Sequence, residues 1–465
     1  MKLGLVGEPC PLATALLYFF CPIPTALFLP PSFYCPTVMT SRILLFIAFW
    51  LGLLLAFDIY VFNSIRAISR DQSIEFRRWL SIGYWGVSVL MVLGLLLFIR
   101  LAQNPDAGVL KAVLSGFFFA NLVFKIFASF FLSIDDLRRL IFWLAAALGR
   151  ATGTEALVGL PISRSDFMAK AALLIAAVPA IGMAYGVARG GHRYQIRRHT
   201  IGMPNLPSEF EGLKIVQISD IHSGSFFNRA GVRRGVELIL KEKPDIIFFT
   251  GDLVNNIATE VEPFIEIFKE LAAPMGVFSV LGNHDYGDYA SWESPEQKRA
   301  NLDRLKNNHK KLGWDLLNDE HRILERNGQQ IAILGVQNWS ARGNFPKYGN
   351  LSKAYVGSEA APVKILLSHD PSHWLAEVTT KYKDIDLALA GHTHGMQFGI
   401  DSKVLKLKWS PVQYVYEQWA GLYTQGKQHL YVNRGFGFIG YPGRLGIWPE
   451  ITVLTLSKNH TVEEA

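Results

Sequence analysis

The sequence predicts a two-part protein, in which an α/β domain follows a bundle of about four membrane-spanning helices. Two observations lead to this fold class. Residues 1 to about 188 are dominated by Leu, Phe, Ala, Ile and Val, whereas residues from about 200 onward have the mixed composition of a globular domain. In that second part, apolar β-branched runs alternate with amphipathic runs, which is typical of βαβ units. A chain of 465 residues has room for both parts.

Four apolar runs in the first part predict membrane-spanning helices. A helix needs about 20 residues to cross the hydrocarbon core, and these runs have no polar face to meet water. They cover residues 43–62, 80–101, 113–132 and 171–187. The last run contains Pro179, which a membrane helix tolerates when neighbours satisfy the freed carbonyl. We therefore expect an integral membrane protein. Core helices of a large soluble protein are the weaker alternative.

Charged residues lie within or beside the apolar runs at three places, and each needs an explanation. Asp58 lies near the end of its run, so we expect it to reach the lipid headgroups. Lys125 lies deeper and is either functional or headgroup-directed, because intramembrane charges are costly. Residues 135–150 combine two acids, two arginines and a short apolar run, which predicts a separate amphipathic helix at the membrane interface.

Residues 10–38 are apolar but interrupted by six prolines, which is unfavourable for a helix. We hypothesise that residues 1–38 are a mis-annotated or unstructured extension and that translation begins at Met39. A cleaved signal peptide is the weaker alternative, because no short apolar region with a small-residue cleavage site stands out. The remaining domains are expected at 39–190 (helical region), 191–210 (basic linker) and 211–465 (catalytic domain).

The distribution of positive charge bears on orientation and on partners. Nine Lys and Arg residues lie in the loops on one side of the predicted spans and seven lie on the other. This margin favours an extracytoplasmic catalytic domain. The net charge of +7 is modest, and no basic run is interleaved with aromatics. We therefore expect lipid and a phosphorylated substrate as partners and no nucleic acid.

Five short polar motifs in the second part each follow an apolar run that predicts a strand. The strands are expected at residues 214–219, 245–250, 277–281, 365–367 and 386–390. The motifs are Asp220-Ile-His222, Gly251-Asp252, Gly282-Asn283-His284-Asp285, Ser368-His369 and Gly391-His392-Thr-His394. In α/β sheets the active site forms beyond the carboxyl ends of strands. A single motif of this kind is usually turn chemistry, but five in succession predict one site.

Helical patterns at residues 229–240, 261–271 and 295–312 separate the early strands. Two late strands, at residues 429–432 and 451–456, lack a long helix between them. We therefore expect a largely parallel sheet and a second, more antiparallel layer.

The residue types point to a dinuclear metal site. Two divalent cations about 3.5–4 Å apart can clamp both the attacking and the departing oxygen of a phosphoryl displacement. Such a pair needs a bridging carboxylate, for which Asp252 is the candidate. Imidazole, carboxylate and amide ligands without thiolate suit Mn, Fe or Zn better than Ca or Mg. No cysteine follows Cys35, so the catalytic half has neither thiolate-bound zinc nor a cysteine nucleophile.

The motifs are similar, over about residues 213–456, to those of the calcineurin-like metallophosphoesterase superfamily. The N-terminal spans, the segment 433–437 and Pro449-Glu450 resemble a bacterial membrane-associated branch. That branch includes exported cell-envelope phosphoesterases and a hydrolase of UDP-2,3-diacylglucosamine. The resemblance implies a two-sheet αββα sandwich. One departure is Met396, which stands where the branch usually has a glycine.

The resemblance also implies roles for individual residues. One cation would be held by Asp220, His222, His394 and the shared Asp252, and the other by Asn283, His369, His392 and Asp252. A hydroxide bridging the two cations would be the nucleophile. His284 would stabilise the phosphoryl group and protonate the leaving oxygen. Asp285 is expected to hold the imidazole tautomer of His284.

The function expected is a membrane-anchored phosphoesterase that hydrolyses phosphoester or pyrophosphate bonds of a lipid-linked or nucleotide-linked envelope precursor. One alternative is an anchored phosphodiesterase of soluble nucleotides or phosphosugars. Another is a transporter or sensor with an accessory phosphoesterase domain. The aromatic stretch at residues 404–423 is either part of the core or an apolar lip that docks on the bilayer.

Overall fold

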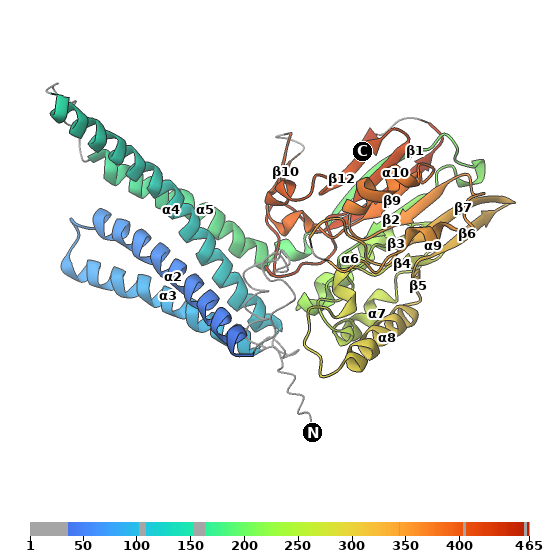
Figure 1. Cartoon of the computed structure of the whole chain (residues 1–465), viewed down its shortest axis with the longest axis horizontal. Helices are drawn as coiled ribbons and strands as arrows, with labels where there is room; N and C mark the ends of the chain where they lie inside the picture. The colour runs from blue at the N-terminus through green and yellow to red at the C-terminus, as the bar shows by residue number, and fades with distance from the viewer. Residues whose placement is uncertain are drawn as a thin grey trace. The chain divides into compact units, whose positions relative to one another are not determined.

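The computed structural model describes residues 36–101, 108–152, 163–343, 345–402, 406–459 and 463–464. It divides into a helical unit, which includes residues 36–101 and 110–185, and an α/β unit from Gly186 to Ala465. Figure 1 shows the long helices of the first unit and the strands of the second. The expected N-terminal extension lies outside the described residues, except that the first helix begins at Pro36.

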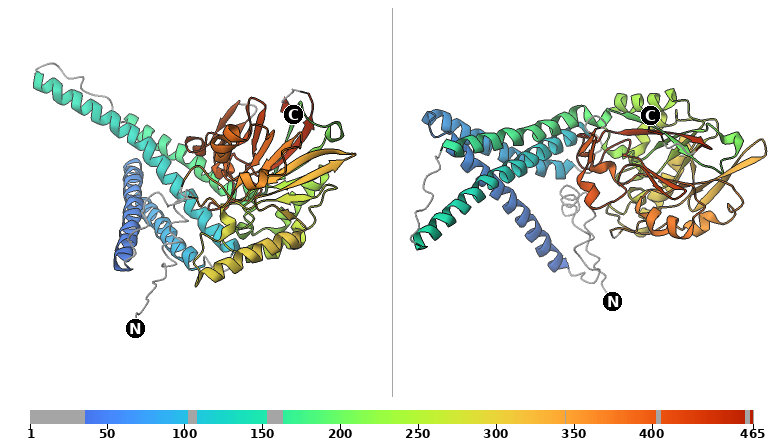
Figure 2. Two further views of the ribbon diagram at one scale, coloured as in Figure 1. Left: turned by 45° about the vertical axis from the view of Figure 1, so that its right-hand side comes forward. Right: turned by 90° about the horizontal axis from the view of Figure 1, so that it is seen from above.

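Four long helices form the helical unit (Figures 1 and 2). They are α2 (Pro36–Ile68), α3 (Ile74–Leu101), α4 (Gly108–Thr152) and α5 (Ser163–Ala188). Within the described residues, each contains a stretch long and apolar enough to cross a membrane: Ala48–Ile68, Ile74–Leu101, Gly108–Leu148 and Phe167–Ala188. The prediction of four spans is thereby confirmed.

The separate interfacial helix expected at residues 135–150 is wrong, because α4 continues through this segment without a break. Asp135 explains the continuity. Its carboxylate accepts hydrogen bonds from Arg138 at 2.8 Å and from Arg139 at 2.8 Å, one turn further along the same helix. Such pairs stabilise a helix locally. The 45 residues of α4 would span roughly 68 Å at 1.5 Å per residue, more than the roughly 30 Å of a hydrocarbon core.

Asp58 does not reach outward as expected, because it lies inside the helical unit and pairs with Lys125. The Nζ atom of Lys125 is 2.7 Å from Oδ1 of Asp58, and the hydroxyl of Ser88 donates to the same oxygen at 2.6 Å. Lys125 is 1% exposed and Asp58 is 4% exposed. Three helices thus contribute to one buried polar cluster. A buried charge is tolerated when it is paired and hydrogen-bonded. Asp58 can therefore stay buried beside Lys125, and the expected outward orientation is wrong.

The α/β unit is built on two mixed sheets. The first has the order β15-β1-β14-β2-β3-β4-β5 and the second β12-β13-β9-β8-β7-β6. The first contains β1 (Gln195–Gly202), β2 (Lys214–Ile218), β3 (Ile246–Phe249), β4 (Val277–Ser279), β5 (Asp315–Leu316), β14 (Glu450–Ser457) and β15 (Glu463–Glu464). The second contains β6 (Glu320–Arg326), β7 (Gln329–Gly335), β8 (Lys364–Leu367), β9 (Leu387–Ala390), β12 (Gly421–Gln425) and β13 (Gln428–Val432). A small hairpin pairs β10 (Ile400–Ser402) with β11 (Leu407–Trp409).

Two expectations about the sheets need correction. The two late strands do not share one layer, because β13 lies in the second sheet and β14 in the first; in the second sheet, antiparallel pairing is confined to the edge strands β6 and β12. The expected basic linker at 191–210 contains β1, which pairs in parallel with β14 from Gln195 opposite Glu450 to Gly202 opposite Ser457. The strand partner of β1 lies about 250 residues further along the chain, so no local pattern could reveal it.

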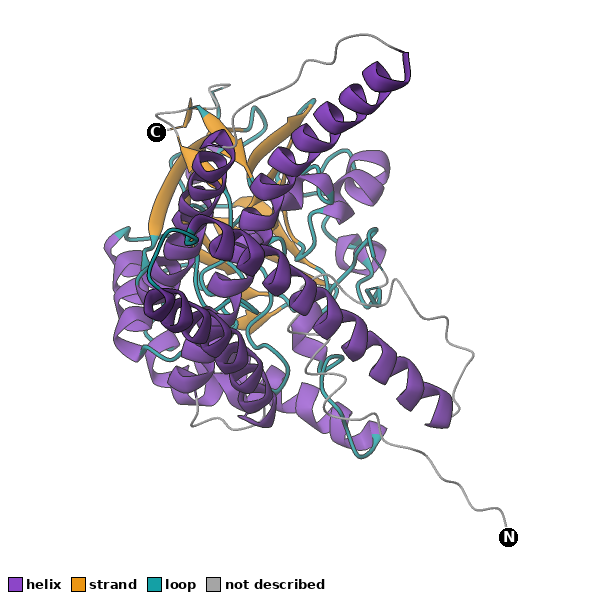
Figure 3. Cartoon of the chain, turned by 90° about the vertical axis from the view of Figure 1, so that its left-hand side faces the viewer, coloured by secondary structure: helices purple, strands orange, loops and turns teal. Residues whose placement is uncertain are grey.

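Alternating side chains of the strands build three apolar layers, which give the αββα arrangement. Figure 3 distinguishes the helices, in purple, from the strands, in orange. Between the sheets, Ile215 and Phe248 of the first sheet pack in one cluster with Leu389 of the second. The opposite face of the first sheet packs on α6 (Arg229–Lys241) and α8 (Pro295–Leu312), and the outer face of the second packs on α9 (Leu351–Tyr355). The helix expected at 261–271 is instead a 3-10 segment, η6 (Ala258–Phe264), which contains Pro263, followed by the short α7 (Ile265–Phe268).

Candidate metal centre

Five strands deliver polar side chains to one place, as their order in the sheets requires. Asp220 and His222 follow β2, Asp252 follows β3, and Asn283 begins η7 (Asn283–Tyr286) after β4. In the second sheet, His369 follows β8, and His392 and His394 follow β9. β2, β3 and β4 run parallel, as do β8 and β9, so each set ends at one edge. The structure brings all seven residues of the expected ligand set together.

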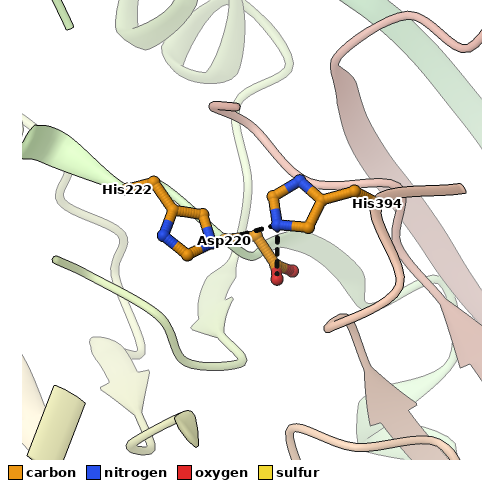
Figure 4. A group of neighbouring side chains, drawn as sticks. All are labelled: Asp220, His222 and His394. Atoms are coloured by element: carbon orange, nitrogen blue, oxygen red, sulfur yellow. Dashed lines mark hydrogen bonds and ion pairs between the residues drawn. The ribbon is translucent and has the colours of Figure 1, made fainter. Parts of the chain in front are cut away.

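Asp220, His222 and His394 form the first buried group (Figure 4). Their ligand atoms all lie within 4.8 Å of one another. The Nε2 atoms of His222 and His394 are 3.0 Å apart, and Nε2 of His394 is 3.2 Å from Oδ1 of Asp220. Two nitrogens bound at right angles to an ion at about 2.1 Å would have a separation of about 3.0 Å. The spacing therefore fits a cation.

Asp252 connects this group to a second one. Its Oδ2 atom lies 3.5 Å from Nε2 of His222 and 3.2 Å from Nε2 of His369. The side-chain oxygen of Asn283 lies 3.2 Å from Nε2 of His369 and 2.8 Å from Nδ1 of His392. One carboxylate oxygen thus lies between two sets of donors, which is where a bridging ligand would have to be.

The backbone at the site adopts the left-handed conformation at several non-glycine residues. Values of φ are 52° at Asp220, 48° at His222, 62° at Asp252, 71° at His392 and 52° at His394. This region is uncommon for non-glycine residues, and each such residue costs of order 1–3 kcal/mol. Strain of this kind concentrates at functional sites, where the surrounding structure holds it. The turn at Asp252 also needs Gly251, because a Cβ there would lie 2.6 Å from the nitrogen of Gly282.

Two residues that the sequence analysis missed orient His392. Its Nε2 atom lies 2.9 Å from the hydroxyl of Tyr416 and 3.5 Å from Oδ2 of Asp370. Tyr416 in turn donates to Asp370 at 3.2 Å. With Nε2 occupied in this way, Nδ1 is the atom that faces Asn283. Partners of this kind fix the tautomer of a metal-binding histidine. Asp370 directly follows His369, which was the one sequence signal available.

Arg444, also missed, packs behind His394. This arginine is fully buried, and its Nη2 atom lies 3.1 Å from Nδ1 of His394. The guanidinium therefore lies on the Nδ1 side of the ring, and Nε2 faces Asp220 at 3.2 Å. Arg444 also donates to the carbonyl of Gly437 at 2.9 Å, which fixes its position.

The expectation for Asp285 is wrong. Its carboxylate accepts hydrogen bonds from backbone N–H groups of Gly282 at 2.9 Å, Asp252 at 3.0 Å and Leu253 at 2.9 Å. The imidazole of His284 bonds elsewhere: its Nδ1 atom is 2.7 Å from the carbonyl oxygen of Asn255. Asp285 is therefore an organiser of the two loops that carry Asp252 and Asn283. Sequence proximity misled the prediction, because adjacent side chains point apart.

The electrostatics of the site also fit a cation. Burial disfavours the charged imidazole of His369, but the negative charge of Asp252 outweighs this and raises the pKa of His369 to about 10. Burial likewise opposes ionisation of Asp220, yet the charge and hydrogen bond of His394 hold its pKa below the usual value. The buried Nδ1 of His222 has no hydrogen-bond partner among the described residues. Buried carboxylates that recruit positive charge, surrounded by nitrogen donors, are suited to divalent cations.

The aromatic stretch at residues 404–423 was expected to be either core or an exposed apolar lip, and the structure shows both. Residues 403–405 are not among the residues that the structure describes. Tyr416 and Trp419 belong to a buried cluster with Val412, against which Met396 packs. Tyr414 is 77% exposed and Leu407 is 44% exposed. The stretch is therefore partly core and partly an exposed apolar surface.

A cluster of carboxylate, amide and imidazole donors at one edge of an αββα sandwich, in a chain that begins with four apolar helices, defines the class of membrane-anchored metallophosphoesterases. Two family models match the chain. Residues 41–191 match the transmembrane domain of probable calcineurin-like phosphoesterases, and residues 213–396 match the calcineurin-like phosphoesterase domain. The chain belongs to the calcineurin-like phosphoesterase family, whose members use divalent metals.

Three relatives illustrate the breadth of the similarity. The chain is 32% identical over 284 residues to the uncharacterized metallophosphoesterase YkuE of Bacillus subtilis, a match that covers 60% of this chain and 92% of the relative. It is 28% identical over 320 residues to a transmembrane protein with metallophosphoesterase domain of Danio rerio, with 68% of each chain covered. It is 26% identical over 300 residues to phosphodiesterase YaeI of Escherichia coli, with 63% of this chain and 99% of the relative covered.

Proposed function

We propose that this membrane-anchored metallophosphoesterase uses two divalent cations to hydrolyse a phosphoester or pyrophosphate bond in a lipid-linked or nucleotide-linked precursor of the cell envelope. The position of Asp252 is the main observation in favour of two cations. Its Oδ2 atom lies within 3.5 Å of His222 on one side and 3.2 Å of His369 on the other. A lone structural cation would not need donors on both sides of one oxygen.

Two ligand sets follow from these positions. Asp220, His222 and His394 would hold one cation together with Asp252, and Asn283, His369 and His392 would hold the other with the same aspartate. The mix of imidazole, carboxylate and amide ligands without thiolate favours Mn, Fe or Zn over Ca or Mg. When bound, the cations would neutralise charge on the phosphoryl oxygens and lower the pKa of a water molecule towards about 7.

His284 is placed to move a proton. It is only partly buried, whereas Asp252 and Asp285 are buried. Its ring stacks edge-on against His222 at 4.9 Å between centroids and lies 4.5 Å from the ring of Tyr289. Because Nδ1–H donates to the Asn255 carbonyl, Nε2 is the atom free to exchange a proton with the leaving oxygen. A positioned histidine contributes typically 10²–10⁴-fold in rate.

A lipid-linked substrate is supported by features outside the metal centre. The four apolar helices hold the protein in a bilayer. Leu407 and Tyr414 are exposed on the α/β unit, and aromatic side chains favour the membrane interface. The excess of nine over seven positive charges in the segments that flank the four apolar runs of the sequence supports a catalytic domain on the extracytoplasmic side of a bacterial inner membrane.

The test is turnover by the full-length protein in detergent, loaded in turn with Mn, Fe and Zn. The substrates are p-nitrophenyl phosphate, bis-p-nitrophenyl phosphate and a polyprenyl pyrophosphate. We expect metal-dependent hydrolysis that is abolished in Asp252→Asn and strongly reduced in His284→Ala, with preference for the lipid substrate. Equal turnover of the soluble diester bis-p-nitrophenyl phosphate would favour the anchored phosphodiesterase instead. Transport that survives Asp252→Asn would favour an accessory role for the domain.

A further inference from the structure

A second cavity, lined by none of the proposed metal ligands, lies in the α/β unit. It has a volume of about 400 Å³, within the range of small-molecule sites. Its walls come from β1 in the first sheet, from β12 and β13 in the second, and from the β10–β11 hairpin. The cavity therefore lies where β1 of the first sheet, β12 and β13 of the second sheet and the hairpin meet.

Positive charge dominates the lining. Four cationic side chains line the cavity, namely Arg197, Lys406, Lys408 and Arg434, against the single carboxylate of Asp401. Asp401 lies 2.6 Å from Nη2 of Arg197 and 2.9 Å from Nη2 of Arg434. Glu450, which is fully buried, pairs with Nη1 of Arg434 at 2.5 Å. These carboxylates hold the two guanidinium groups in place but do not balance the two lysines.

Lys408 and Arg434 converge at Gly421. A Cβ at that position would lie 3.5 Å from Nζ of Lys408 and 3.8 Å from Nη2 of Arg434. Gly421 has φ of 78°, a conformation that glycine adopts without strain. Glycine therefore keeps open the space between the two cations.

The crowding of cations favours an anion. Burial and then the charge of Arg434 lower the pKa of Lys408 to about 8. Arg434 is 2% exposed, and its Nε atom has no hydrogen-bond partner among the described residues. A guanidinium presents donors in a fork that matches phosphate. An anion between these groups would relieve their repulsion and accept hydrogen bonds from both.

We propose that this cavity binds a phosphate group, with Lys408 and Arg434 as its principal contacts. The apolar part of the lining includes Leu407 and Leu422, which would contact the organic substituent of a phosphomonoester. The group can come from a soluble phosphorylated molecule or from a lipid headgroup, because both present the same oxygens. This site is separate from the metal centre and does not depend on the function proposed for it.

The experiment is calorimetric titration of the full-length protein in detergent with inorganic phosphate and, separately, with monomeric dihexanoyl phosphatidic acid. Both titrations are run in native protein and in Asp252→Asn, so that phosphate binding at the metal centre is recognised by its loss in that variant. Lys408→Gln removes the charge, and Lys408→Arg restores it. Lys427→Gln, in the exposed turn between β12 and β13, is the matched control. Thermal unfolding of each variant verifies the fold.

We expect Lys408→Gln to weaken binding at least tenfold in both backgrounds, and Lys408→Arg and Lys427→Gln to retain it within about twofold. A loss with both titrants assigns a general phosphate site. A loss confined to phosphatidic acid assigns a headgroup site. Equal affinities in Lys408→Gln and Lys427→Gln for both titrants, in folded protein, would overturn the proposal.

Discussion

The imidazole of His284 is oriented by Asn255, whose carbonyl oxygen lies 2.7 Å from Nδ1. A backbone carbonyl can only accept, so Nδ1 carries the proton in the neutral ring. Nε2 is then the nitrogen available for proton exchange. The carboxylate next to His284 in sequence, Asp285, is occupied with backbone N–H groups. His284 is therefore placed for proton exchange, whereas Asp285 holds the backbone of the site. One substitution at each residue can distinguish the two roles.

His284→Ala should reduce kcat by about 10²–10⁴-fold, because it removes the group that exchanges the proton. The bound metal should stay unchanged, since none of the proposed ligand contacts involves the ring of His284. Steady-state kinetics together with metal analysis would check this. His321→Ala, outside the metal centre, is the matched control. A parallel loss of metal would show that His284 is a ligand or a support for one.

Asp285→Asn should lower metal content and stability rather than alter the proton-transfer step. An amide places two donors where backbone N–H groups now donate, and a buried unsatisfied group costs about 1–3 kcal/mol. We expect a lower melting temperature, weaker metal binding and partial recovery of rate at high metal concentration. An activity loss at full metal occupancy with unchanged stability would instead support a direct pairing with His284.

Tyr416→Phe should weaken metal binding by about 10-fold or more, because partners behind a metal-binding histidine typically contribute 10–100-fold. The hydroxyl that is removed lies 2.9 Å from Nε2 of His392. Competition with a chelating dye would measure the affinity. Tyr414→Phe, at a side chain that is 77% exposed, should leave it unchanged. Identical affinities in the two variants would contradict the role given to Tyr416.

Acid should destabilise the α/β unit through His309. Burial lowers the pKa of His309 to about 3, below the unfolded value of about 6.5. The folded pKa is the depressed one, so this contribution is fully present above pH 6.5 and is lost as the pH falls towards 3. His309→Phe should flatten the fall in melting temperature between pH 6.5 and 4, because it removes the titrating ring packed near Trp314. An unchanged pH slope would show that other groups account for it.

We expect a single substitution in the Asp58–Lys125 pair to destabilise the protein and the double substitution to restore much of that stability. Lys125→Met leaves a buried carboxylate without its partner, which costs about 3–5 kcal/mol, whereas replacing both partners with uncharged residues is often neutral. Unfolding of the detergent-solubilised protein would be compared for Lys125→Met, Asp58→Asn and the double variant. A double variant as unstable as the sum of the two single variants would show that the charges do not interact.

The local pattern was sufficient for the spans, for the five strands that precede the polar motifs and for the residues that follow those strands. Apolar runs of sufficient length mark the four helices, and β2, β3, β4, β8 and β9 lie within about two residues of their expected positions. A strand followed by a polar motif is a local property. The parallel order of the strands then brings those motifs together, which is why all seven expected ligands were found in one place.

The tertiary structure alone decided which distant groups complete the site and the fold. Tyr416 contacts His392, which is 24 positions away in the sequence, and Arg444 contacts His394, which is 50 positions away. Lys125 on α4 pairs with Asp58 on α2. β1 finds β14 at the far end of the chain. Sequence periodicity reports only neighbours within a few residues, whereas these contacts depend on how packed layers bring remote segments together. The sequence by itself therefore predicted the ligand types of a metal site, and only the folded structure determined which distant groups orient them.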